Sequence, residues 1–261
     1  MIFKQAQRIT EPETARADPL QIRFLTVGHQ FMCIVNNTYQ FIFVHIPKCA
    51  GTSTTHTLSH LTTYADLELG STAYGEKLHA IMGPRFGLAK HSFASEIRGV
   101  VGQQVWKRYF TFSFVRNPYS RTLSTYAYLK QHEKKGYAFM EAYETFDEFV
   151  SSEDWSRPGP DRMLQPQFFW VRRRHESLEL AVDFVGKVET YEADLDKVVD
   201  LIGVNEHDRV KLRTEKKNVS AKPKKAGPAL SETSIERIRE RYAPDFDAFG
   251  YDLDPPDDWG A

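Results

Sequence analysis

Residues 41–53 constrain the fold of this chain more than any other segment. They read Phe-Ile-Phe-Val-His-Ile-Pro-Lys-Cys-Ala-Gly-Thr-Ser. The apolar first half is typical of a buried strand, and the turn that follows predicts a helix from Thr52 to Leu61. Backbone N–H groups, hydroxyls and a lysine then stand at a helix N-terminus, where an anion is favoured. The segment is therefore interpreted as a phosphate-binding loop.

This loop differs from the Walker A loop of nucleotide kinases. A Walker A loop carries its lysine directly after the second glycine, whereas Lys48 precedes Gly51 by three residues. A tight turn with a solvated lysine is the alternative interpretation of the same residues.

A second strand-to-helix turn follows later in the chain. Aromatic and β-branched residues over 109–115 predict a strand. Asn117 in the N-cap position and Pro118 at the first helical position predict a helix directly after it. Arg116 lies at the turn itself, and Ser124 lies two helical turns further on. Arg116 is thus either a second anion ligand or the ion-pair partner of an acidic neighbour.

Together the two turns resemble those of sulfotransferases that use 3′-phosphoadenosine 5′-phosphosulfate (PAPS). The lysine-first loop resembles their 5′-phosphosulfate loop. The Arg116-Asn117-Pro118 turn, with a serine eight residues after the arginine, resembles their 3′-phosphate motif. The similarity extends from Phe41 to Tyr251 and is greatest with the carbohydrate (Golgi-type, family 2) sulfotransferases. It implies an enzyme that transfers the sulfuryl group of PAPS to a hydroxyl of an acceptor, a carbohydrate.

The resemblance implies a role for each matching position. Lys48 would stabilise the leaving phosphate, and Arg116 with Ser124 would bind the 3′-phosphate. The residues implied to bind the 5′-phosphate are Lys48, Cys49, Ala50, Gly51, Thr52 and Ser53. Ser220 and Lys222, in a late basic run, are implied to fold over the nucleotide. A solvated lysine-rich loop explains that run equally well.

A general base must remove the acceptor's proton, and histidine is suited to this at neutral pH. His91 is the candidate, because it lies between the two turns, where the resemblance implies a catalytic histidine. A structural or capping histidine is the alternative, and Glu76 or Glu96 would then be the nearest carboxylate base. His45, within the predicted strand, is interpreted as a core residue.

Metal chemistry is not expected. His56 and His60 lie one helical turn apart, a spacing that can bind a metal ion. No third ligand with a suitable spacing accompanies them in the sequence.

Acceptor binding is assigned to a segment that mixes aromatic and basic residues. Residues 165–170 contain two phenylalanines and a tryptophan, and Arg172, Arg173 and His175 follow. Aromatic faces stack on sugar rings, and arginines hold acidic sugars. Arg172, Arg173 and His175 are therefore the candidates for acceptor binding. A helix with a buried aromatic face and an exposed basic face is the alternative.

Strands that alternate with helices predict an α/β fold. The resemblance makes this a P-loop-like three-layer fold, with a central parallel β-sheet flanked by helices. Further strands are predicted over 31–35 and 182–188, helices over 92–108 and 233–242, and a variable loop over 64–88. Thr145 and Glu148 have the spacing of a capping box.

The chain length of 261 residues fits one such domain. Residues 26–261 are assigned to it, after a flexible N-terminal arm over residues 1–25. The net charge of −1 gives no general attraction to nucleic acid, and two cysteines exclude a disulfide framework. No stretch resembles a signal peptide or a membrane-spanning helix. Because the Golgi relatives normally carry an anchor, this predicts a cytoplasmic, bacterial protein.

Two other functions are weighed against sulfuryl transfer. A nucleotide kinase of related P-loop fold lacks support because the Gly-Lys-Ser/Thr sequence is missing and no clear Walker B aspartate follows a strand. A non-catalytic glycan-binding module on a degenerate scaffold is disfavoured by the presence of Lys48, Arg116 and Ser124.

Overall fold

A computed structural model describes most of the chain beyond its first 32 residues. The described residues are 33–69, 73–87, 91–135, 137–159, 162–173, 179–216, 228, 230–256 and 259. The predicted N-terminal arm and the predicted site residues His175, Ser220 and Lys222 lie outside this part of the chain. Among the described residues, no helix combines the length and the apolar character that crossing a membrane requires.

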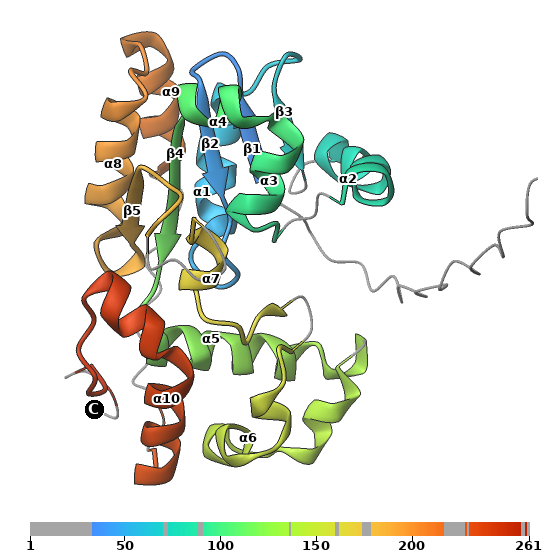
Figure 1. The fold of residues 1–261 in the computed structure, drawn as a ribbon, viewed down its shortest axis with the longest axis vertical. Helices are drawn as coiled ribbons and strands as arrows, with labels where there is room; N and C mark the ends of the chain where they lie inside the picture. Colours follow the sequence, from blue (N-terminus) through green and yellow to red (C-terminus); the bar gives the residue numbers. More distant parts are fainter. Residues whose placement is uncertain are drawn as a thin grey trace, which may run out of the picture.

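A five-stranded mixed sheet forms the centre of the fold (Figure 1). Its strands are β1 (Cys33–Asn36), β2 (Phe41–Val44), β3 (Leu67–Leu69), β4 (Phe110–Val115) and β5 (Phe184–Lys187), in the order β3-β1-β2-β4-β5. β2, β4 and β5 are parallel neighbours, whereas β1 runs antiparallel to β2 and β3. The predicted α/β class with a central sheet between helices is confirmed, and the antiparallel pairs are confined to the β1 side.

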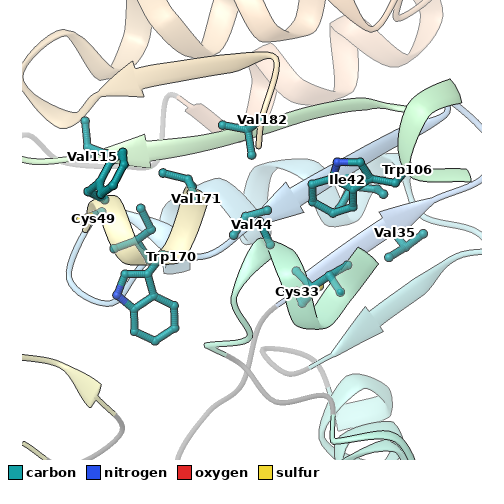
Figure 2. Close-up of a cluster of buried hydrophobic side chains, with 14 of the residues drawn as sticks. Cys33, Val35, Ile42, Val44, Cys49, Trp106, Val115, Trp170, Val171 and Val182 are labelled. Carbon is teal, nitrogen blue, oxygen red and sulfur yellow. The ribbon is translucent and has the colours of Figure 1, made fainter. Parts of the chain in front are cut away.

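Side chains alternate between the two faces of the sheet, as the pleat of a strand requires. Phe41 and Phe43 point to one face, which is covered by α1 (Gly51–Leu58), α8 (Tyr191–Leu201) and α9 (Glu206–Lys216). Ile42 and Val44 point to the other face, which is covered by α3 (Ala94–Val101), α4 (Gln103–Arg108) and α7 (Phe168–Val171). Figure 2 shows this second cluster, with Cys49 and Trp170 towards one end. Both faces are thus buried.

A third group of helices lies beyond the carboxyl end of the parallel strands (Figure 1). It consists of α5 (Pro118–Gln131), α6 (Phe146–Ser151) and α10 (Glu232–Phe249), with short 3₁₀ turns between α5 and α6. These helices share a hydrophobic cluster that includes Phe149 and Tyr242. Because α5 follows β4 directly, the second predicted turn lies where this helical group meets the sheet.

The predicted loop over residues 64–88 is wrong. The segment contains β3 and α2 (Ala73–Phe86). β3 is only three residues long and exists because it pairs with the outer side of β1, a contact that no local pattern reveals. Pro84 lies within the last turn of α2, which ends at Phe86.

Two predicted helices have different bounds from those expected. The helix over 92–108 is divided into α3 and α4 at Gly102, whose φ of 84° does not fit a helix. The last helix continues to Phe249, because a kink at Tyr242 (φ −104°, ψ 19°) accommodates Pro244.

Candidate functional site

The first predicted anion-binding loop connects β2 to the N-terminus of α1. Ala50 is the N-cap residue, in the left-handed conformation (φ 57°), and no side chain caps the helix. The first turn of α1 contains no acidic residue. The first N–H groups of a helix have no partner within it, so this terminus has the character of an anion site.

Gly51 is required here by a close contact with His45. A Cβ atom on Gly51 would lie 1.7 Å from Nε2 and 1.9 Å from Cδ2 of His45. The His45 ring is buried, and its centroid lies 4.7 Å from that of His91. His91 also meets the edge of Trp170, at 5.8 Å between ring centroids. His45 therefore lies between the ring of His91 and Gly51 of the loop. It is buried, as expected, and it also borders the loop.

Replacement of Gly51 by alanine is expected to lower the free energy of unfolding by ~1–3 kcal/mol, because the added methyl group would overlap the His45 ring. Thermal unfolding measures this. Gly99→Ala is the matched control, because a Cβ at that helical glycine meets nothing within 4 Å. The additional change His45→Ala is expected to recover part of the stability lost in Gly51→Ala. An unchanged melting temperature in Gly51→Ala would contradict the close contact.

Lys48, in the first motif, reaches the helix of the second motif. Its Nζ atom is 4.3 Å from the centre of the Tyr128 ring. Tyr128 belongs to α5, the helix of the second motif, and lies one turn after Ser124. Because residues four apart share a helix face, Ser124 lies on the side of α5 that carries Tyr128. Lys48 and Ser124 are both half-buried.

The second motif has the local structure that its sequence predicts. Oδ1 of Asn117 accepts hydrogen bonds from the N–H groups of Tyr119 (3.0 Å) and Ser120 (3.4 Å), so it caps α5 as expected. Arg116 is half-buried between β4 and this cap. Since β2 and β4 are parallel neighbours, both motifs lie at the same edge of the sheet.

Arg121 is a buried residue of the site that the sequence interpretation missed. The residue is 1% exposed. It donates hydrogen bonds to the carbonyl oxygens of Pro47 (3.0 Å), Met163 (2.9 Å) and Gln165 (2.9 Å). α5 is therefore bound directly to the residue before Lys48. No local sequence signal distinguishes this arginine from one on the protein surface, because its partners are backbone carbonyl groups.

Cys49 is a neutral thiol in this structure. Burial raises its pKa to about 12, although the nearby charges of Arg121 and Arg116 oppose the shift. Its Sγ donates a hydrogen bond to Oε1 of Gln167 (3.0 Å). A thiol with this pKa is not a nucleophile at neutral pH, so Cys49 contributes to the loop through packing, its backbone and its hydrogen bond to Gln167.

Glu189 is a second residue at this edge that was not predicted. Its carboxylate accepts hydrogen bonds from the Asn117 N–H (2.8 Å) and from the Tyr251 hydroxyl (2.9 Å). It follows β5, so all three parallel strands end in residues of this region. Burial, followed by the charge of Glu189, raises the pKa of Tyr251, which keeps the phenol protonated.

The described acceptor candidates lie at the end of α7. Arg172 stacks on the Phe169 ring at 4.4 Å, and burial lowers its pKa. Arg173 is exposed and forms an ion pair with Glu179 (2.9 Å). Phe168 and Trp170 are buried in the core. α7 thus has a buried aromatic face and a basic end at the surface. This arrangement is the alternative to acceptor binding that the sequence left open.

The remaining candidates are placed as follows. Glu96 accepts a hydrogen bond from the Phe93 N–H (2.8 Å) and pairs with Arg162 (3.1 Å), so its carboxylate caps α3. The side chain of Glu76 lies outside the described residues. His56 and His60 are exposed, with ring centroids 5.8 Å apart. Within the described ranges, no three His, Cys, Asp or Glu side chains are grouped as metal ligands.

A family model described as "Sulfotransferase family" matches residues 32–252. The chain belongs to the sulfotransferase family. The match to this sulfotransferase model includes all five strands and both motifs. An uncharacterized protein of Archaeoglobus fulgidus is 33% identical over 118 residues, which are 45% of this chain and 88% of that protein. A crystal structure of mouse sulfotransferase SULT7A1 complexed with PAP aligns with 72% of this chain and 70% of its own, at 16% identity and a TM-score of 0.39.

Proposed function

We propose that this sulfotransferase moves the sulfuryl group of PAPS to a hydroxyl group of a carbohydrate. The observation that carries the proposal is the contact between Lys48 of the first motif and Tyr128 on the helix of the second. This contact supports a site in which Lys48, proposed for the 5′-phosphosulfate, lies near the side of α5 that carries Ser124, proposed for the 3′-phosphate. A donor with phosphate groups at the 3′ and 5′ positions of its ribose requires two such anion sites side by side.

The residues present suit this donor. The 5′-phosphate would be bound at the uncapped N-terminus of α1 by the amides of the loop and the hydroxyls of Thr52 and Ser53. Arg116 and Ser124 would bind the 3′-phosphate, where a guanidinium makes charge-assisted hydrogen bonds. Ser220 and Lys222, outside the described residues, would complete the nucleotide site.

The reaction requires two tasks from the protein. PAPS supplies a sulfuryl group bound to phosphate oxygen. His91 takes the proton of the acceptor hydroxyl as its oxygen bonds to sulfur, and Lys48 neutralises the charge on the phosphate oxygen as the old S–O bond breaks. The neutral Cys49 thiol takes no part. The products are a sulfate ester and adenosine 3′,5′-bisphosphate.

His91→Ala is expected to reduce turnover by roughly 10²–10⁴-fold, because it removes the general base. The affinity for adenosine 3′,5′-bisphosphate is expected to stay close to that of the unchanged protein. Initial rates at saturating PAPS and calorimetric titration measure the two quantities. His56→Ala, at an exposed histidine of α1, is the control. Full turnover in His91→Ala would show that another group is the base.

The acceptor class is tested by transfer of ³⁵S from labelled PAPS to a panel of compounds. The panel contains neutral saccharides, uronic-acid-containing saccharides, a tyrosine peptide and a simple phenol. Label in a saccharide that is lost on Lys48→Met supports the proposal. Transfer only to the peptide or the phenol would overturn the carbohydrate assignment while leaving the donor assignment intact.

A further inference from the structure

Gln167 is a buried side chain that joins the two motifs. Its Oε1 accepts hydrogen bonds from the Arg116 N–H (2.8 Å) and the Cys49 thiol (3.0 Å). Its Nε2 donates to the Arg116 carbonyl (2.8 Å) and to Oδ2 of Asp245 (3.1 Å). A primary amide offers two donors and two acceptor positions. All four are used, and the residue is 0% exposed.

The orientation of this amide is fixed by its partners. The backbone of Arg116 presents an N–H group and a carbonyl to the same side chain, so only one placement of amide oxygen and nitrogen satisfies both. Asp245, from α10, then holds Gln167 in place. Its carboxylate accepts hydrogen bonds from the backbone N–H groups of Gln167 (2.9 Å) and Phe168 (2.8 Å). Asp245 is itself fully buried.

The residues on either side of Lys48 are anchored separately. Pro47 is bound through its carbonyl to Arg121, and Cys49 is bound through its thiol to Gln167. Lys48 and Ala50 have φ values of 66° and 57°, a conformation that costs energy in residues other than glycine. Such a conformation persists when its surroundings hold it, and these two anchors supply that restraint.

We propose that Gln167 is a positioning residue, which fixes the 5′-phosphate loop relative to Arg116 so that one nucleotide engages both phosphate sites at once. This inference rests on the proposed function. Two sites at a fixed separation bind a ligand carrying both phosphates more tightly than sites that move independently, because less freedom is lost on binding. Gln167 contacts backbone and thiol groups of the motifs, so it acts through them.

The test compares two nucleotides in the full-length protein. Adenosine 3′,5′-bisphosphate uses both sites, and adenosine 5′-phosphate uses only the loop. The ratio of their affinities therefore reports how well the two sites are aligned. Gln167→Met keeps the side-chain volume but removes all four hydrogen bonds. We expect this ratio to fall about tenfold in Gln167→Met, in line with couplings within one hydrogen-bond network.

Gln165→Met is the matched control, because Gln165 is two residues away and contributes its backbone carbonyl to Arg121. Its affinity ratio is expected to stay unchanged. A purely structural role of Gln167 would lower both affinities by the same factor, through the folded fraction, and leave the ratio intact. An unchanged ratio in Gln167→Met would overturn the inference.

A second variant tests the same link if Gln167→Met does not fold. Cys49→Ala removes the thiol that joins Gln167 to the loop, together with the packing of its sulfur atom, and keeps the bonds between Gln167 and Arg116. We expect a smaller decrease of the ratio, and an unchanged ratio would again overturn the inference. The nucleotide preference of the unchanged protein tests the proposed function itself, independently of Gln167. If it shows no preference for the bisphosphate over the 5′-phosphate, the proposed function fails, and the inference fails with it.

Discussion

Lys48→Met is expected to reduce sulfuryl transfer by roughly 10²–10³-fold or more, the usual loss when one group that stabilises developing charge is removed. Lys48 is a half-buried cation within the first predicted loop, and its Nζ lies against Tyr128 on the helix of the second motif. Methionine keeps an unbranched apolar chain of similar length and removes only the charge. The loop amides remain, so binding of adenosine 3′,5′-bisphosphate is expected to weaken far less than turnover.

Initial rates at saturating PAPS, together with the bisphosphate affinity, measure this difference. Lys107→Met is the control, because Lys107 is an exposed lysine of α4. Its rate is expected to match that of the unchanged protein. Comparable rates in Lys48→Met and Lys107→Met would show that Lys48 has no role in the reaction.

Arg116→Ala is expected to weaken binding of adenosine 3′,5′-bisphosphate by roughly 10–100-fold, since a charge-assisted hydrogen bond contributes about 1.5–3 kcal/mol. The affinity for adenosine 5′-phosphate is expected to change little, because this nucleotide lacks the 3′-phosphate. The backbone of Arg116 is held by Gln167, so the variant is expected to fold normally.

Calorimetric titration with the two nucleotides measures these affinities. Arg108→Ala, at an exposed arginine of α4, is the control for a general loss of positive charge. An equal loss of affinity for both nucleotides in Arg116→Ala would point to a disturbed loop rather than a missing 3′-phosphate ligand.

The two strand-to-helix turns were predictable because their signals are local. The apolar run before Lys48 predicted β2, and Asn117 with Pro118 predicted the start of α5. The capping box of Thr145 and Glu148 likewise marks α6 as expected. Each of these features depends on residues within a few positions of one another, and tertiary packing did not override them.

The buried connections between the turns were not predictable in this way. Gln167 binds the backbone of Arg116 across 51 residues, and Arg121 binds Pro47 across 74 residues. Buried polar side chains of this kind are indistinguishable from surface ones in a sequence, because their partners are backbone groups that any residue possesses. β3 was missed for a related reason, since its strand character comes from pairing with β1.

The most direct measurement of the central claim is calorimetric titration of the unchanged protein with adenosine 3′,5′-bisphosphate and, in parallel, with ATP and Mg²⁺. We predict a clear preference for the bisphosphate, because Arg116 and Ser124 are proposed to bind its 3′-phosphate. Equal or tighter binding of ATP would contradict the two-phosphate site and favour a nucleotide kinase.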